Sequence, residues 1–235
     1  MATCDRLCPA AMALPLLLLL ELALYASCFI CGIVTAALVT IVQGHTEGKC
    51  LLYGVLTYND TAKLISVSST SHPSLCYFVS GISVCVAIFC FSLTLYWVYS
   101  SCVDGDIRRE RLWLNVTLGI SGVFLFFLLI SGCILKIGRD KLCQSLPQNA
   151  FDRCEDAQQV TWAAPYNGDK FYSSLHSAET SVWVNFFFWA IIGGLAFFQR
   201  RKGSTEYRGG SGGGENIVGA SPGETEPFFN RPGRP

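Results

Sequence analysis

Four long apolar stretches limit what this chain can fold into. A helix needs about 20 mainly apolar residues to cross a hydrocarbon core of about 30 Å. The stretches lie at residues 14–42, 75–99, 112–135 and 181–198. Lipid offers no hydrogen-bond partner to backbone groups, so only helices and closed barrels can span it. The stretches lack the alternating pattern of barrel strands, and we therefore predict an all-α membrane protein built as a four-helix transmembrane bundle.

The first stretch also resembles a secretory signal peptide, because it has a leucine-rich core at Leu16–Leu20 and small residues at Ala26 and Ser27. The apolar core of a signal peptide is about 7–15 residues long. Here the apolar character continues to Val42, which favours a retained helix over a cleaved one. Met12 is a second candidate start of translation, and in that case residues 1–11 are optional.

Four spans place both ends of the chain on the same side of the membrane, and the charges indicate the cytosol. The segments that we assign to the cytosol, 1–13, 100–111 and 199–235, hold ten Lys and Arg residues. The two loops that we assign to the lumen or the outside, 43–74 and 136–180, hold seven. This bias agrees with the positive-inside rule. We expect the plasma membrane or a secretory or endosomal membrane.

Cysteines give independent support for this orientation. Of the twelve cysteines, four lie in or directly beside the two loops on the lumenal side, two for each loop, and this even number suits an oxidising compartment. The opposite orientation would place an odd number there. Four cysteines allow three pairings. We favour pairing within each loop, Cys50 with Cys76 and Cys143 with Cys154, because it requires no assumption about the distance between the loops.

The first loop has the pattern of a β-hairpin. Residues 50–58 and 62–68 are β-prone and flank the turn dipeptide Asn59-Asp60. Asn59 also begins an Asn-Asp-Thr sequon, so it is the glycosylation candidate. The second loop is long and rich in aromatic residues, and we expect it to fold against the first loop or to bind a partner. Together the loops form a small disulfide-tied cap. The tail after residue 199 is rich in Gly, Pro and Glu, which predicts disorder.

Three polar residues inside the apolar stretches are candidates for an intramembrane function. Glu21 could bind an ion or relay a proton. Alternatively, the bilayer begins near Leu22, and Glu21 then lies among the cytosolic headgroups. Asn115 and Asn185 lie near the ends of their spans, where each could line a pore or form a hydrogen bond with a neighbouring helix.

Several cysteines invite a chemical interpretation. Cys28 and Cys31 have the spacing of a redox motif, but a thiol in lipid stays protonated and behaves as a small apolar group. Cys102 flanks a span on the cytosolic side and is the palmitoylation candidate. Cys4 and Cys8 are weaker candidates for the same modification.

No pattern of catalytic or metal-binding residues stands out. The three histidines, His45, His72 and His176, are far apart in the sequence and lack metal-ligand spacing. There is no phosphate-binding glycine loop and no nucleophile motif. The formal net charge of zero gives no basis for a nucleic-acid partner. We therefore predict no enzyme activity, no metal and no cofactor.

Small residues recur where helices could meet, and they favour close packing within the bundle. A seam between two copies of the chain is the alternative, so a homo-oligomer is compatible with the sequence. The small residues are Gly32, Ala36, Ser80, Gly81, Ser83, Gly119, Ser121, Gly122, Gly193 and Gly194.

Five segments resemble the transmembrane protein 179 family, and most closely its B branch. They are GKCLLYG (48–54), PSLCYFVSGIS (73–83), YWVYSSC (96–102), SGCILKIG (131–138) and FYSSLHSAETSVWVN (171–185). The resemblance covers about residues 12–200 and implies a four-span membrane protein without implying any activity. The chain lacks the Cys-Cys-Gly of tetraspanins, the Gly-Leu-Trp of claudins and the three cysteines per loop of connexins.

These features predict a non-enzymatic accessory or scaffold protein that lies in the lipid bilayer and binds other membrane proteins. The alternative is a subunit of a channel or transporter, for which Glu21, Asn115 and Asn185 would supply the polar groups.

Overall fold

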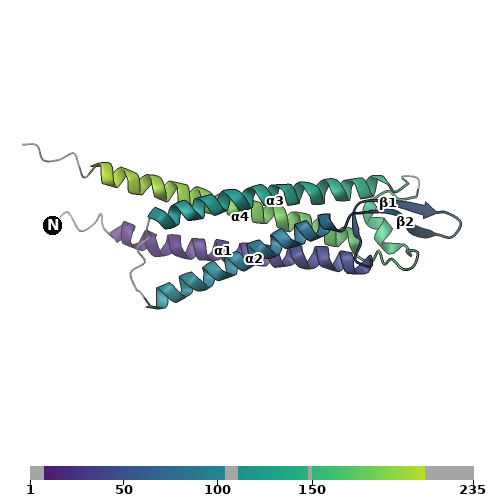
Figure 1. Ribbon diagram of the computed structural model, residues 1–235, viewed down its shortest axis with the longest axis horizontal. Helices are drawn as coiled ribbons and strands as arrows, with labels where there is room; N and C mark the ends of the chain where they lie inside the picture. The colour runs from purple at the N-terminus through teal and green to yellow at the C-terminus, as the bar shows by residue number, and fades with distance from the viewer. Residues whose placement is uncertain (1–7, 104–110, 148–149, 210–235) are drawn as a thin grey trace, which may run out of the picture. The chain divides into compact units, whose positions relative to one another are not determined.

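Figure 1 shows a computed structural model of the chain, which describes residues 8–103, 111–147 and 150–209. Its elements are α1 (Cys8–His45), β1 (Cys50–Asn59), β2 (Leu64–Ser71), α2 (Ser74–Val103), α3 (Arg111–Gln144), η1 (Cys154–Gln159) and α4 (Phe171–Gly209). The chain divides after Arg200 into two units. The second unit is described only at residues 201–209, which are the end of α4.

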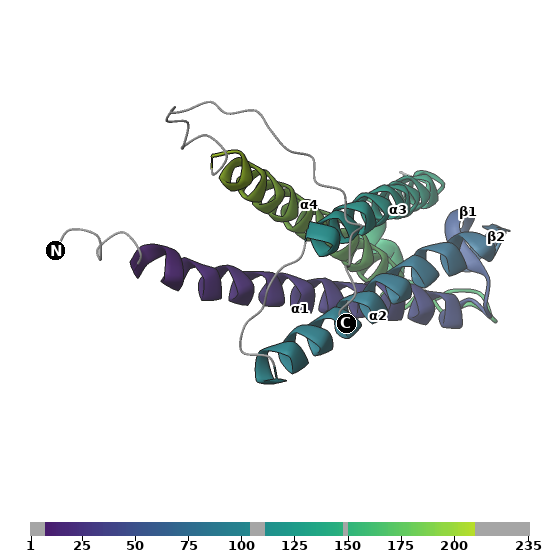
Figure 2. The same cartoon turned by 60° about the vertical axis from the view of Figure 1, so that its left-hand side comes forward.

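In the first unit, the four helices run alongside one another, and the hairpin lies at the end of the bundle opposite the start of α1 (Figure 1). Figure 2 shows the same arrangement from another direction. The predicted four-helix bundle with a hairpin is thereby confirmed. All four helices are long and apolar enough to cross a membrane.

The helices extend beyond the apolar stretches. Helix α3 has 34 residues, which is about 51 Å at 1.5 Å per residue and exceeds the hydrocarbon core. The segment 136–180, predicted as a loop, is helical at both ends, because 136–144 belong to α3 and 171–180 to α4. Hydropathy marks where lipid contact ends, whereas a helix continues until a residue breaks it or packing stops.

Helices α1 and α2 pack closely through small residues. A Cβ atom added to Gly32 would lie 2.8 Å from the carbonyl oxygen of Ser83 and 3.1 Å from the Cβ of Ala87. We call this interface between α1 and α2 the seam. Further along α1, Ala36 is buried, and the hydroxyls of Thr40 in α1 and Ser80 in α2 lie 3.4 Å apart. The predicted packing role of the small residues is therefore correct at Gly32.

Aromatic side chains from all four helices meet in one layer of the bundle. Trp189 of α4 is completely buried. Its ring centroid lies 6.1 Å from Tyr25 of α1, 6.1 Å from Phe89 of α2 and 4.8 Å from Phe124 of α3. Aromatic groups of this size bury a large apolar area and hold the helices in a fixed arrangement.

The hairpin has the turn that the sequence predicts. Strands β1 and β2 pair antiparallel, with Leu56 opposite Val67 and Asn59 opposite Leu64. The Asn59 side-chain oxygen accepts hydrogen bonds from the backbone N–H groups of Thr61 and of Ala62, at 3.0 and 3.2 Å. An Asn at this position stabilises a turn because its side chain substitutes for a backbone acceptor.

Candidate functional site

The hairpin and the segment between α3 and α4 form a cap that rests on the last turns of α3. Gly138 of α3 provides the space, since a Cβ there would lie 2.6 Å from a methyl carbon of Leu52. The backbone N–H of Leu56 donates a 2.9 Å hydrogen bond to the hydroxyl of Ser145. We use "the cap" for residues 46–73, 145–147 and 150–170.

Two disulfides tie the cap to the helices. Cys50 at the start of β1 joins Cys76 in the first turn of α2, and Cys143 in the last turn of α3 joins Cys154. The Cα atoms of the two pairs are 5.7 and 5.4 Å apart, within the usual range for a disulfide. The predicted pairing within each loop is confirmed.

The second loop adds a short strand-like contact to the hairpin, which the sequence pattern did not reveal. Ile65 of β2 donates a 3.1 Å hydrogen bond to the carbonyl of Thr161 and accepts a 2.8 Å bond from the N–H of Ala163. Between them Trp162 is buried, with its indole N–H bonded to the carbonyl of Ala157 and its ring 5.1 Å from Phe171. Trp162 therefore joins the two loops into one body, as we expected of the second loop.

A contact between Lys49 and Tyr166 also joins the two loops of the cap. The Lys49 ammonium donates a 3.0 Å hydrogen bond to the Tyr166 hydroxyl and lies 5.4 Å from its ring centroid. This hydrogen bond, with the electrostatic attraction of Tyr166, raises the pKa of Lys49. Because Lys49 is exposed, the contact contributes orientation more than stability.

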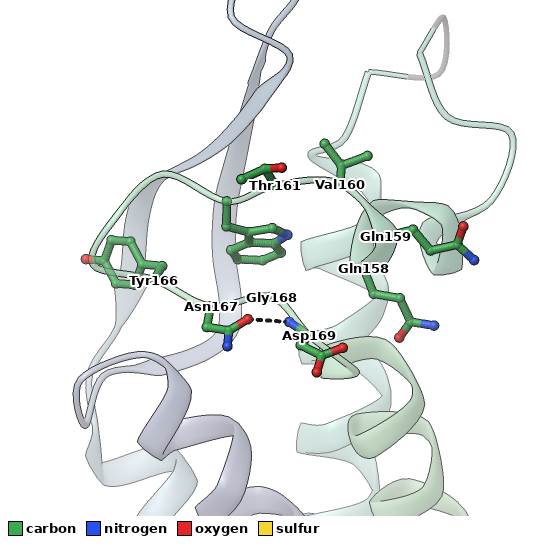
Figure 3. Close-up of a pocket in the computed structure, with 9 residues that line it drawn as sticks. Gln158, Gln159, Val160, Thr161, Tyr166, Asn167, Gly168 and Asp169 are labelled. Carbon is green, nitrogen blue, oxygen red and sulfur yellow. Dashed lines mark hydrogen bonds between the residues drawn. The ribbon is translucent and has the colours of Figure 1, made fainter.

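The cap contains a recess of about 390 Å³ (Figure 3). It is lined by Gln158, Gln159, Val160, Thr161, Trp162, Tyr166, Asn167, Gly168 and Asp169. Two of the side-chain amides are held in place: Gln158 accepts from Ser173, and Asn167 accepts a 2.9 Å bond from the N–H of Asp169. The lining can accept a small polar group, and it includes the carboxylate of Asp169.

A buried ion pair connects α3 and α4 below the cap. The guanidinium of Arg139 lies 2.5 Å from the carboxylate of Glu179, and each side chain is about nine-tenths buried. Arg139 also contacts Asp140 at 3.1 Å and the ring of Tyr172 at 5.8 Å. Sequence reasoning missed this pair, because the two residues are far apart along the chain and each lies at the edge of an apolar stretch.

The three predicted intramembrane polar residues do not come together. Glu21 is only 5% exposed and accepts a 2.7 Å hydrogen bond from the amide of Gln199 on α4. Asn185 is also buried, whereas Asn115 is exposed on the surface of α3. The side chain of Glu21 therefore faces the neighbouring helices, which hydropathy does not show, and its depth in the bilayer stays a prediction.

The aromatic layer separates Glu21 from Asn185. Glu21 precedes Tyr25 by one helical turn, and Asn185 precedes Trp189 by one turn on the antiparallel helix α4. Since the Tyr25 and Trp189 rings are in contact, the two polar residues lie on opposite sides of them. The side-chain oxygen of Asn185 has no hydrogen-bond partner among the described residues.

The cysteines predicted as palmitoylation sites lie at the edge of the described structure or beyond it. Cys102 lies in the last turn of α2, and Cys8 is the first residue of α1. The side chains of both residues lie outside the described part of the structure. Cys4 lies outside the described residues. Palmitoylation of Cys102 stays a prediction.

Comparison with known proteins gives a family model and several relatives. The model described as the transmembrane protein 179/179B claudin domain matches residues 17–228. The chain is 64% identical over 226 residues to transmembrane protein 179B of Danio rerio, covering 95% of this chain and 100% of the relative. It is 43% identical to the protein of that name from Homo sapiens, covering 84% and 89%. No solved structure gives a significant match.

These matches confirm the predicted resemblance to the transmembrane protein 179 family. The family model is described as a claudin domain although this chain lacks the Gly-Leu-Trp motif of claudins. A missing motif excludes the contacts that its side chains make, but it does not exclude an architecture of four helices and a hairpin.

Proposed function

Since the chain belongs to the transmembrane protein 179/179B family of multi-pass membrane proteins, we propose that it is a non-enzymatic accessory or scaffold protein that binds other membrane proteins through its cap. The observation that carries this proposal is the rigidity of the cap. Two disulfides, the contact of β1 with α3 and the buried Trp162 hold it in one arrangement. A surface ordered before binding loses little conformational freedom when a partner docks.

Exposed apolar side chains on and beside the cap support a binding role. Val55 of β1 is 43% exposed, and Tyr77 in the first turn of α2 is 62% exposed. Tyrosine is enriched where proteins contact one another, because its ring is apolar and its hydroxyl is polar. Tyr77 lies at the start of the candidate span Ser74–Tyr99, where a membrane-embedded partner could reach it.

We further propose that the cap faces the lumen or the cell exterior and that both ends of the chain are cytosolic. The two cap disulfides favour an oxidising compartment. Asn59 of the sequon is exposed at the tip of the hairpin, as an oligosaccharide acceptor must be. The membrane would be the plasma membrane or one of the secretory or endosomal membranes.

The orientation predicts that Asn59 carries an N-linked glycan in cells. We expect the mature chain to gain mobility in an electrophoretic gel when peptide N-glycosidase is added, and the Asn59→Gln variant to show no change. Asn115 also begins a sequon, but it lies in α3 within a candidate span. The Asn115→Gln variant should therefore show the same shift in mobility as the unsubstituted chain. An unglycosylated chain at the cell surface would contradict the orientation.

The alternative, a subunit of a channel or transporter, draws on the buried carboxylate of Glu21. Buried ionisable groups within a membrane span often serve transport. The contact between Tyr25 and Trp189 argues against a continuous path, because these rings separate Glu21 from Asn185. Ion flux into liposomes that hold the chain, lost in Glu21→Gln, would favour this alternative.

Photo-crosslinking tests the accessory function directly. A benzophenone amino acid at Val55 or at Tyr77 should link the chain to the same integral membrane protein in living cells. The matched control is Phe126 in the middle of α3, which is 60% exposed and should link to lipid. Cap positions that link only to lipid or water, or to a different protein in each experiment, would count against the proposal.

A further inference from the structure

Two cysteines that are distant in the sequence face each other inside the bundle. Cys28 of α1 and Cys90 of α2 are both completely buried and are not part of a disulfide. Both side chains point into the interface between α1 and α2, where neighbouring residues of the two helices are in contact. The Cys28–Cys31 spacing is not interpreted as a redox motif, and in the structure Cys28 lies at the interface between α1 and α2, as Cys90 does.

Two independent contacts support this register. The rings of Phe29 and Phe91, the residues next to the two cysteines, are 5.5 Å apart. One turn further along α1, the space at Gly32 brings the backbones of the two helices unusually close, with Ala87 opposite. A disulfide requires Cα atoms about 4.4–6.8 Å apart, and a seam packed on glycine is where two helices approach such a separation.

We propose that Cys28 and Cys90 form an intramembrane dithiol, which lipid peroxyl radicals convert into a third disulfide that ties α1 to α2. The site lies in the apolar interior of two candidate spans. Water-soluble oxidants are excluded from this depth, whereas the acyl chains of a bilayer would surround the helices that carry the two thiols.

The chemistry suits an apolar medium because no charge is created. A thiolate, the usual nucleophile, is unfavourable there. Instead, one peroxyl radical abstracts a hydrogen atom from the first thiol and becomes a hydroperoxide, which leaves a thiyl radical. A second peroxyl radical then abstracts the hydrogen atom of the neighbouring thiol, and the two thiyl radicals combine to form the S–S bond. Two S–H bonds break, one S–S bond and two O–H bonds form, and both sulfurs are oxidised while both radicals are reduced.

The other membrane-embedded cysteines of the described part provide internal controls. Cys31 is partly exposed, and Cys85 and Cys133 are exposed on the helix surfaces. Being closer to lipid, they meet the oxidant first. Oxidation at these positions should give sulfenic or higher acids rather than a bond within the chain.

The test uses the full chain in nanodiscs of polyunsaturated phosphatidylcholine, with a lipid-soluble azo compound that starts peroxidation. Unreduced digests analysed by mass spectrometry should contain the Cys28 and Cys90 peptides linked together and lighter by two hydrogen atoms. The link should disappear with dithiothreitol and in Cys90→Ala, and it should persist in Cys85→Ala.

Two results would overturn the proposal. In the first, Cys28 and Cys90 stay reduced while Cys31 and Cys85 become oxidised. In the second, the link joins two chains, or forms equally fast with hydrogen peroxide in the absence of lipid peroxidation. Because the unsubstituted chain carries the main result, a variant that fails to fold does not decide the outcome.

Discussion

Replacing Gly32 by leucine should destabilise the bundle by about 3 kcal/mol, the upper part of the usual range for overpacking. The new side chain would begin 2.8 Å from the carbonyl oxygen of Ser83, which is backbone and cannot turn away. Helices α1 and α2 would have to separate, and the contact between Phe29 and Phe91 would be lost with the seam. Thermal unfolding of the detergent-solubilised chain would show the loss as a lower midpoint.

The matched control is Gly194→Leu in α4, because nothing lies within 4 Å of a Cβ added at Gly194. This variant should unfold close to the temperature of the unsubstituted chain. Equal destabilisation by both substitutions would show that leucine disturbs the helices in general, and it would remove the support for a close seam at Gly32.

Replacing Glu179 by alanine should cost about 3–5 kcal/mol, because it leaves the Arg139 guanidinium buried without its carboxylate. The other nearby acid, Asp140, has a side chain that is 46% exposed and cannot replace Glu179 in the interior. The free energy of unfolding, measured by denaturant titration in detergent, would report the loss.

Two further variants separate the ion pair from the general effect of substitution. Asp140→Ala removes a carboxylate that is also close to Arg139 but about half exposed to solvent, and it should cost less than about 1 kcal/mol. The double variant Arg139→Met, Glu179→Leu should recover most of the stability, since apolar residues often replace a buried pair without loss. A Glu179→Ala variant as stable as Asp140→Ala would contradict the buried pair.

The features that could be predicted from sequence are those set by local patterns. The lengths of the apolar stretches indicated the four helices, and the Asn59-Asp60 dipeptide between β-prone segments indicated the hairpin. The disulfide partners followed from pairing the two cysteines of each loop. In each case the partners lie close in the sequence, so few alternatives compete.

The features that could not be predicted depend on contacts between distant segments. Arg139 with Glu179, and Ile65 with the backbone around Trp162, meet only after the helices have packed. The same applies to Cys28 and Cys90, which lie far apart in the sequence and are both buried at the interface between α1 and α2. Hydropathy also could not show the rotation of each helix, which decides that Asn185 is buried and Asn115 exposed.

The native mass of the full chain, tagged at its C-terminus and extracted from cells in mild detergent, tests the central claim most directly. Every companion present in a fixed ratio would be identified in the same particle. The proposed accessory function predicts a particle that contains a second, different membrane protein, released when the cap is disrupted by Cys143→Ala together with Cys154→Ala. A closed homo-oligomer of this chain without any companion would contradict that claim.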